Sequence, residues 1–191
     1  MNVSQATEII KQGGIGIFPT DTAFGIGCRV DNAESVKRLF EIRRRPGTQA
    51  TPVLFDKINQ VKEYTLPFDS RVESLMQKYW PGALTIVLDC ITEKVSPLVR
   101  GEGKTLGVRI PDHKTILELI SGAGIPILGP SANFHGDETP FNFESLNPEL
   151  VKLVDFVLPG ETKGTGFAST VVDCSKEPWD IIRQGSVYIS E

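Results

Sequence analysis

Residues 18–25 read FPTDTAFG, and residues 43–46 read RRRP. The first segment is a turn rich in hydroxyl groups that directly follows an apolar run typical of a buried strand, residues 15–18. The second segment ends a predicted helix that Asn32 can cap, with apolar side chains at helical spacing at Ala33, Val36, Leu39 and Phe40. Hydroxyl groups beside concentrated guanidinium charge suit an anionic ligand that carries phosphate.

The rest of the chain alternates helix and strand patterns early and is dominated by strand patterns late. We expect helices after Ser4, after Asp69 and over 115–120, and strands over 52–55, 84–88, 106–110, 125–128, 154–158, 168–173 and 179–182. This order predicts a mixed sheet with helices packed on it. Residues 134–147 are polar and rich in proline, which predicts an exposed, mobile connection. A chain of 191 residues, 40% hydrophobic, predicts a single domain over residues 1–191.

Composition limits the classes of partner and compartment. The net charge of −4 argues against a surface coated with positive charge for indiscriminate nucleic-acid binding, so a basic function must be local. Cys28, Cys90 and Cys174 are odd in number and widely separated in the sequence. This pattern fits neither a disulfide framework nor a CxxC zinc site, which indicates a reducing compartment. The first residues lack a secretory signal and no apolar run is long enough to span a membrane. We therefore expect a cytoplasmic protein with no membrane partner.

Three familiar motifs are not supported. Residues 101–105 end like a P-loop, but Leu98 occupies the position of its first glycine and a strand pattern follows instead of a helix. His113 and His135 have no evident serine or cysteine partner, so a hydrolytic triad is not indicated. Asp21 and Glu41 could contact a magnesium ion through water, but the sequence predicts no protein ligand for a metal.

Short polar motifs end several predicted strands. Arg109 alternates with Leu106, Val108 and Ile110, so it should point to the face opposite that apolar set and is a candidate ligand clamp. Each other motif, read alone, is more simply a turn, a cap or a solvated helix end. Taken together they predict one polar site, formed by the arginine triplet with Thr20, Thr22, Arg109, Ser131, Asn133, Ser169, Thr170 and Arg183.

An ordered series of motifs resembles the YrdC family, the threonylcarbamoyl-AMP synthases. The series covers nearly the whole chain: FPTDTAFGIG (18–27), RRRP (43–46), WPGALT (80–85), VRIP (108–111), PSAN (130–133), STVVD (169–173) and RQG (183–185). The resemblance implies an α/β fold of the YrdC type, a twisted, mixed, open sheet with flanking helices around a positively charged concave cavity.

The resemblance also implies a nucleotidyltransferase reaction. In this reaction L-threonine, bicarbonate and ATP, with Mg²⁺, give threonylcarbamoyl-AMP and diphosphate, which starts the modification of an adenosine beside the tRNA anticodon; downstream tRNA threonylcarbamoyl-transfer proteins would be partners. By position, threonine would be held by Thr22, Arg109, Ser131 and Ser169, and ATP by Arg45, Thr105, Asn133 and Arg183. Arg43 and Arg45 are the catalytic candidates, because both reactants are anions and clamping by cations should contribute most.

Some positions depart from the family pattern. Arg43 replaces the usual lysine of a Lys-x-Arg motif, the 47–51 loop is longer, and Phe55 or Asp56 falls where many members have a threonine-contacting histidine. Phe141 and Gln184 also differ from the common threonine and proline. The long loop is similar to the YciO branch, whereas PSAN and STVVD favour the synthases. The chain has no room for the C-terminal domain of the longer members.

Two other functions remain open from the sequence. One is a non-catalytic RNA-binding module that uses Lys37, Arg38 and Arg43 to Arg45 on the phosphates of tRNA or double-stranded RNA. The acidic total charge and the absence of a series of aromatic residues for base stacking place it second. The other is a carbamoyl-transfer role like that of the YrdC-like domain of hydrogenase maturation proteins.

Overall fold

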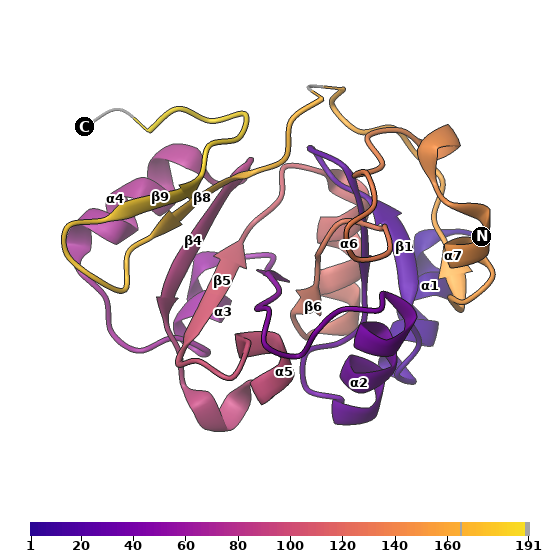
Figure 1. Ribbon diagram of the computed structural model, residues 1–191, viewed down its shortest axis with the longest axis horizontal. Helices are drawn as coiled ribbons and strands as arrows, with labels where there is room; N and C mark the ends of the chain where they lie inside the picture. The colour runs from indigo at the N-terminus through magenta and orange to yellow at the C-terminus, as the bar shows by residue number, and fades with distance from the viewer. Residues whose placement is uncertain (165, 190–191) are drawn as a thin grey trace.

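The computed structural model describes residues 1–164 and 166–189 (Figure 1). Its helices are α1 (Val3–Lys11), α2 (Ala33–Ile42), α3 (Ile58–Lys62), α4 (Ser70–Tyr79), α5 (Pro97–Arg100), α6 (Lys114–Ala123) and α7 (Pro148–Val151), with 3₁₀ turns η1 (Thr92–Lys94) and η2 (Phe143–Ser145). Its strands are β1 (Gly16–Pro19), β2 (Phe24–Gly27), β3 (Val53–Leu54), β4 (Leu84–Asp89), β5 (Thr105–Arg109), β6 (Ile127–Leu128), β7 (Phe156–Val157), β8 (Thr170–Asp173) and β9 (Asp180–Arg183). No helix in this part of the chain is both long and apolar enough to cross a membrane.

Side-chain caps begin most of the predicted helices. The Asn32 side chain accepts a hydrogen bond from the Ser35 amide at 3.0 Å, and Asp69 accepts one from the Arg71 amide at 2.7 Å, as predicted. The prediction for α1 is wrong by two residues. Asn2 caps this helix, since the Asn2 and Gln5 side chains each accept from the other residue's amide, at 2.9 and 3.0 Å, in a capping box.

The strands form two sheets rather than one. A three-stranded sheet has the order β2-β1-β7, and a six-stranded sheet has the order β6-β3-β5-β4-β8-β9. Both are mixed: β1 pairs parallel with β7, and β3 with β5, whereas β1 with β2 and β4 with β5 are antiparallel. The segment after β6 joins the sheets, because the Ile26 amide donates to the Pro130 carbonyl at 2.9 Å. Strand β2 was not predicted, since its two glycines interrupt the apolar pattern.

Helices cover the sheets on their outer sides. Ala6 and Ile10 of α1 pack with Ile116, Leu119 and Ile120 of α6 in a cluster that also holds residues of β1 and β7. Figure 1 shows these two helices together beside β1, with α4 beside β8 and β9 at the other end of the molecule. The main core lies between the six-stranded sheet and α4, and extends to α2 through Val36, Leu39 and Phe40. This packing leaves the concave side of the six-stranded sheet uncovered.

The connection over residues 134–147 is only partly the exposed loop that the sequence predicts. Phe134 and Leu146 are buried, and η2 forms inside the segment. The Phe24 amide also donates to the Pro140 carbonyl at 2.9 Å, which ties the loop to β2. The buried side chains of Phe134 and Leu146 hold this polar segment against the fold. The polar composition of the segment does not predict their burial.

Gly27 lies where β2 packs tightly against β6. A Cβ atom at this position would lie 1.7 Å from the Leu128 carbonyl oxygen, and backbone cannot move aside as a side chain can. We expect Gly27→Ala to lower the free energy of unfolding by about 2–3 kcal/mol, the range for an overpacked core, as measured by urea unfolding. Gly107→Ala is the control, because its Cβ would meet only an ordinary contact at 3.4 Å. Equal stability of the two variants would contradict this account.

Candidate functional site

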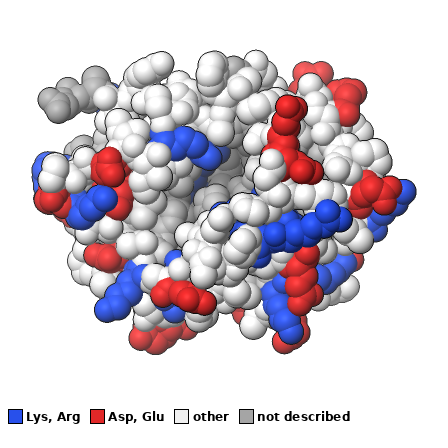
Figure 2. Space-filling model, viewed as in Figure 1, with Lys and Arg blue, Asp and Glu red and all other residues white. Residues whose placement is uncertain are grey.

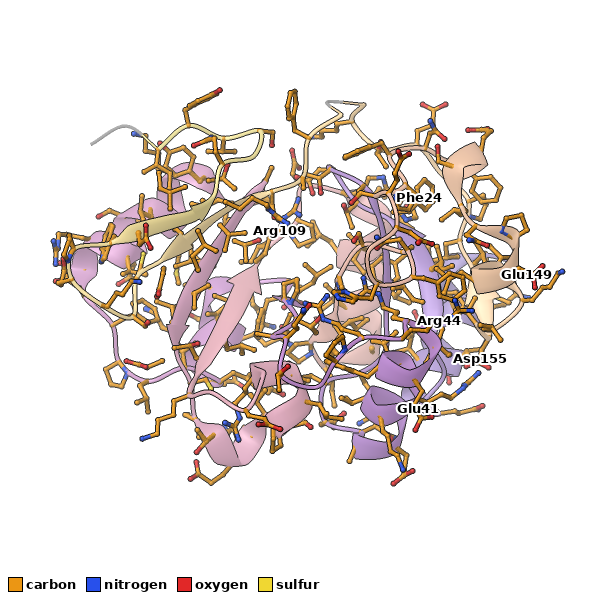
Figure 3. All side chains as sticks on the ribbon, viewed as in Figure 1. Phe24, Glu41, Arg44, Arg109, Glu149 and Asp155 are labelled. Carbon is orange, nitrogen blue, oxygen red and sulfur yellow. The ribbon has the colours of Figure 1, made fainter. Side chains whose placement is uncertain are left out.

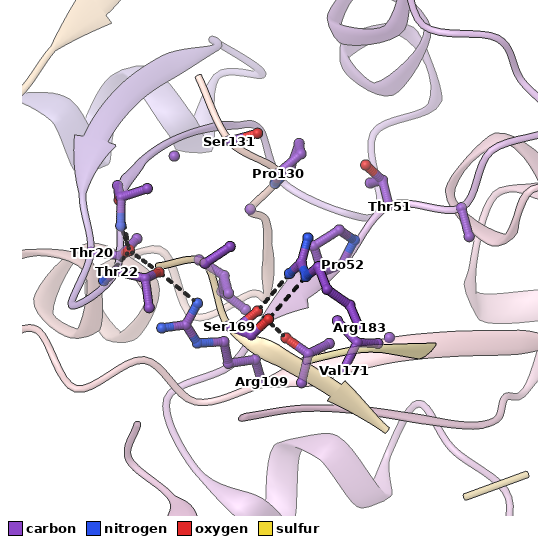
Figure 4. Close-up of a pocket in the computed structure, with 18 of the residues that line it drawn as sticks. Thr20, Thr22, Thr51, Pro52, Arg109, Pro130, Ser131, Ser169, Val171 and Arg183 are labelled. Carbon is purple, nitrogen blue, oxygen red and sulfur yellow. Dashed lines mark hydrogen bonds between the residues drawn. The ribbon is translucent and has the colours of Figure 1, made fainter. Parts of the chain in front are cut away.

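A cavity of about 430 Å³ lies between the two sheets. The turn before β2 and the segment 129–131 form one wall, and the six-stranded sheet forms the other. Figure 2 shows the hollow opening on the viewed face, with a blue basic side chain on its rim. Its close-up in Figure 4 shows side chains from both walls pointing toward one another.

Strand periodicity explains which side chains line the cavity. Along β5, Thr105, Gly107 and Arg109 face the cavity, whereas Leu106 and Val108 are fully buried in the core. The same alternation of faces along β4 and β8 brings four more residues to the cavity: Thr85, Val87, Val171 and Asp173. The prediction that Arg109 points away from the apolar set is confirmed.

The structure brings most of the predicted site residues to this one cavity. Those that line it are Thr20, Thr22, Arg43, Arg45, Thr105, Arg109, Ser131, Ser169 and Arg183, whereas Thr170 is not among the lining residues. Asn133 is not among the lining residues and instead contacts two of them from behind. Side chains separated by up to 160 residues of sequence therefore share one concave surface.

Arg109 is fixed by three separate partners. Its Nη2 forms a buried ion pair with Asp21 at 2.6 Å, its Nη1 donates to Thr22 Oγ1 at 3.0 Å, and its Nε donates to the Gly82 carbonyl at 2.9 Å. Burial lowers the pKa of Arg109, and the charge of Asp21 opposes that shift. Each terminal nitrogen keeps a second N–H, so the group remains able to bind a carboxylate with two hydrogen bonds.

Asp21 is the ion-pair partner of Arg109. Its carboxylate is buried against Arg109, and Glu41 lies on the exposed side of α2. Among the described residues, no group of three or more histidine, cysteine or acidic side chains is arranged to hold a metal ion. Asp173 lines the cavity, but its Oδ1 already accepts from the amide and hydroxyl of Ser175.

Ser169 links the sheet to Arg183. The Ser169 and Thr85 hydroxyls share a hydrogen bond of 2.9 Å, and Arg183 donates from Nη2 to the Ser169 hydroxyl and from Nε to its carbonyl, both at 3.0 Å. Figure 4 shows these bonds with Arg183 beside the cavity. Burial of the guanidinium and the charge of Arg109 lower the pKa of Arg183. A substitution that removes the Ser169 hydroxyl would therefore also remove one of the two bonds that hold Arg183.

Asn133 connects Arg43 with Ser131. Arg43 donates from Nε to the Asn133 carbonyl at 3.1 Å and from Nη2 to Asn133 Oδ1 at 3.2 Å, and the Ser131 hydroxyl donates to the same Oδ1 at 2.7 Å. The Asn133 amide nitrogen in turn donates to the Asp137 carbonyl at 2.6 Å. A planar guanidinium can make two parallel bonds of this kind and a lysine ammonium cannot, so Arg43 is held more rigidly than a lysine would be.

Two polar atoms at the cavity have no partner in the described part of the chain. Arg43 Nη1 and Thr51 Oγ1 are both buried and make no hydrogen bond there. Buried polar groups without partners are rare in native proteins and call for an explanation such as a missing ligand. Burial and the charge of Arg45 lower the pKa of Arg43 to about 10, which leaves the group charged at neutral pH.

The arginine triplet is shaped by the end of α2. The Arg45 amide donates to the Phe40 carbonyl and the Arg44 amide to the Glu41 carbonyl, both at 3.0 Å, which forms a Schellman turn. Arg44 occupies its left-handed position with φ of 53°, a conformation that costs a non-glycine residue about 1–2 kcal/mol. The turn sends Arg43 and Arg45 to the cavity and Arg44 elsewhere.

The long 47–51 loop wraps around Arg45. Arg45 donates from Nε to the Gln49 carbonyl at 3.2 Å and from Nη2 to the Ala50 carbonyl at 2.6 Å. Both acceptors are neutral, so the arginine keeps its charge unpaired while its direction is fixed. The loop also supplies Ala50 and Thr51 to the cavity lining. Neither residue was predicted from the sequence to belong to the site. Only the unusual loop length pointed to this segment.

Positive charge exceeds negative charge in the cavity. Four arginines line it, and Asp173 is the acidic residue among the lining residues. Asp21 neutralises Arg109, but within the described part of the chain no carboxylate forms an ion pair with Arg43, Arg45 or Arg183. Arg43 is buried, and a buried cation without a counterion destabilises a protein unless something else compensates it. The arrangement is therefore suited to binding a polyanion.

The five basic residues of the alternative RNA-binding function differ in their exposure: Lys37, Arg38 and Arg44 are exposed, whereas Arg43 is buried. Arg38 pairs with Asp155 through two bonds of 2.7 and 3.0 Å on the outer side of α2. Arg43 is only 3% exposed and faces the cavity. Arg43 is therefore not part of the exposed basic surface on which Arg38 lies.

Comparisons with known proteins agree with this geometry. A family model named for Sua5, YciO and YrdC, described as "Telomere recombination", matches residues 8–185. The chain is 32% identical over 185 residues to the threonylcarbamoyl-AMP synthase of Bacillus subtilis, across 97% of this chain and 54% of that protein. It thus spans about half the length of that relative.

Solved structures show the same architecture. Pyrococcus abyssi Sua5, solved in complex with L-threonine, has a TM-score of 0.89 at 29% identity, across 96% of this chain and 54% of that one. Escherichia coli YciO has a TM-score of 0.85 at 26% identity, across 96% of this chain and 89% of that one. The mixed α/β fold with flanking helices is the one that the sequence predicts.

Proposed function

Because the chain belongs to the Sua5/YciO/YrdC family, we propose that it is a threonylcarbamoyl-AMP synthase. It would convert L-threonine, bicarbonate and ATP to threonylcarbamoyl-AMP and diphosphate. One observation carries the proposal: unpaired guanidinium groups lie in the same cavity as a neutralised arginine surrounded by hydroxyl groups. The first set suits a triphosphate, and the second suits an amino acid that carries a hydroxyl group.

The cluster around Arg109 would bind threonine. The two N–H groups that Arg109 keeps free match the two oxygens of an α-carboxylate. Thr22 and Ser131 on one wall of the cavity and Ser169 on the other supply hydroxyl groups for the amine and the side-chain hydroxyl. Because Asp21 already balances Arg109, this subsite carries no excess charge when empty, and a zwitterionic amino acid suits it better than a polyanion does.

The unpaired arginines would bind and align ATP. The amine of threonine reacts with bicarbonate or carbon dioxide to give a carbamate, whose oxygen attacks the α-phosphorus while diphosphate leaves. Both partners are anionic, so Arg43, Arg45 and Arg183 would reduce their repulsion and stabilise the charge that develops on the phosphate oxygens. No side-chain nucleophile is needed. The fixed directions of Arg43 and Arg45 mean that little reorganisation is required during the reaction.

Magnesium would be held mainly by the nucleotide. The cavity offers one carboxylate, Asp173, which already has hydrogen-bond partners, and Mg²⁺ at such sites commonly keeps water and phosphate ligands. When bound, the ion would neutralise charge on the phosphates. The donor set of this chain fits a cation delivered with ATP rather than one held by the protein alone.

The proposal extends to the cell. A threonylcarbamoyl-AMP synthase would work in the cytoplasm, where its product would pass to proteins that transfer the threonylcarbamoyl group to tRNA. Arg38 and Arg43 do not form a joint basic surface, which favours this role over RNA binding without catalysis.

Diphosphate release tests the proposal. Purified protein with ATP and Mg²⁺ should release diphosphate only when both L-threonine and bicarbonate are present, as a coupled pyrophosphatase assay measures. Omission of either co-substrate is the internal control, and L-serine, which lacks one methyl group, should react more slowly, by about 10–200-fold. Release that is independent of threonine, or no release above background, would refute the assignment.

A further inference from the structure

The Schellman turn at the end of α2 places one arginine outside the cavity between two that line it. The Arg44 guanidinium lies over the Phe134 ring, 4.3 Å from its centroid. Figure 3 labels Arg44 just above Glu41, where α2 ends. The ring itself is 6% exposed and directly follows Asn133 in the chain. Arg44 is therefore in contact with the loop that holds Ser131 and Asn133.

Further contacts join the same two segments. The His135 amide donates to the Arg43 carbonyl at 2.8 Å, and Arg43 donates twice to Asn133. These bonds involve residues of the cavity or backbone atoms. The stack of Arg44 on Phe134 is different, because it can be removed without changing any side chain that lines the cavity.

We propose that Arg44 is a positioning residue: its stack on Phe134 fixes Arg43 and Arg45 to the loop that carries Ser131 and Asn133. The inference rests on the function proposed above, since it links the ATP side of the cavity to the threonine side. Cation–π contacts of this kind stabilise a defined orientation of the two partners. Loss of the stack would loosen the connection between the triplet and the loop, leaving only the bonds that Arg43 makes with Asn133 and His135.

The choice of residue at position 44 supports this role. Glycine is the usual residue in the left-handed position of a Schellman turn, because it adopts positive φ without strain. The chain has arginine there, with φ of 53°, so the helix end alone would be better served by glycine. The Arg44 side chain must then offset the cost of this backbone conformation through its contact with the Phe134 ring. Stability and ligand binding should respond in opposite directions when Arg44 is replaced by glycine.

Arg44→Gly is the decisive variant. We expect its melting temperature to be equal to or above that of the wild type, since the strain is relieved. Its dissociation constant for ATP, measured by calorimetry, should rise about fivefold, the scale of a lost cation–π contact. The Michaelis constant for ATP should rise more than kcat falls. Arg44→Lys keeps a cation over the ring and should restore most of the affinity.

A matched control uses another stacked arginine. Arg71 lies over Trp179 at 5.1 Å and is not a cavity residue, so Arg71→Lys should leave the affinity for ATP unchanged.

Phe134→Leu removes the other partner of the Arg44 stack. The double variant that combines Arg44→Gly with Phe134→Leu should bind ATP no more weakly than the weaker-binding single variant. Both substitutions remove the same interaction, so their effects should not add.

Hydrogen exchange separates this inference from the proposed function. The His135 amide bonds to Arg43, so its exchange should be faster by about fivefold in Arg44→Gly, whereas amides of α4 keep the wild-type rate. This readout needs no ligand. If the wild type binds no ATP but exchange accelerates as expected, the function is wrong and the positioning role stands. If the exchange rate of the His135 amide is unchanged in Arg44→Gly, the positioning role is wrong. It is also wrong if the wild type binds ATP and Arg44→Gly binds ATP with the same affinity.

Discussion

Arg43→Met should lower kcat/KM for ATP by about 10²–10³-fold, the loss seen when one preorganised donor to a developing oxyanion is removed. Methionine has a similar length but no charge, so it fills the space without binding phosphate. The coupled diphosphate assay at saturating threonine and bicarbonate measures the effect. We expect most of the loss in kcat, because Arg43 is already held in place by Asn133 before ATP arrives.

Stability should behave differently in the same variant. Arg43→Met loses two hydrogen bonds to Asn133, each contributing about 1 kcal/mol, but also removes a buried cation that has no counterion in the described structure. The free energy of unfolding should therefore stay equal or increase. Arg38→Met, on the outer side of the same helix, is the control and should keep full activity. A large loss of stability together with activity would mean that Arg43 is structural.

Asp21→Asn should lower the free energy of unfolding by about 3–5 kcal/mol, the range for removal of one partner from a buried ion pair. Arg109 is 6% exposed, so without Asp21 its charge would stay buried and uncompensated. Urea unfolding measures the change. Activity should also fall, because Arg109 would lose the bond that directs Nη2.

Asp31→Asn is the matched control for this variant. Asp31 also pairs with an arginine, Arg29, at 2.6 Å, but its side chain is 38% exposed, so its loss should cost at most about 1 kcal/mol. A second variant, Asp21→Ala with Arg109→Met, removes both charges and should recover much of the stability lost by Asp21→Asn without recovering activity. Equal costs for Asp21→Asn and Asp31→Asn would contradict the importance of burial.

The sequence predicts the elements of the fold better than their arrangement. Asn32 and Asp69 were identified as caps because a side-chain cap is a local interaction, and β4 and β5 because their apolar residues have clear periodicity. Strand β2 was missed because glycines at 25 and 27 hide the alternation. The junction between the two sheets includes the close approach of Gly27 to the Leu128 carbonyl, which no local pattern encodes.

The site shows the same division between local and long-range information. Alternation along β5 placed Arg109 on the cavity face, and the ordered motifs contain several of the other lining residues, such as Thr22, Arg43 and Arg183. The role of Asp21 as the partner of Arg109 joins positions 88 residues apart and could not be predicted from spacing. Asn133 was expected to bind ATP and instead lies behind Arg43 and Ser131, because its side chain is already bonded to both.

The convergence of Thr22, Arg43, Arg109 and Arg183 on one cavity has a consequence for biosynthesis. The chain leaves the ribosome in order, so the anion-binding surface is incomplete until Arg183 has been translated and β9 has paired with β8. A nascent chain that stops before that point would contain the cluster around Arg109 but lack one of the four arginines of the cavity. Nucleotide could then assist only the last stage of maturation, after the six-stranded sheet has closed.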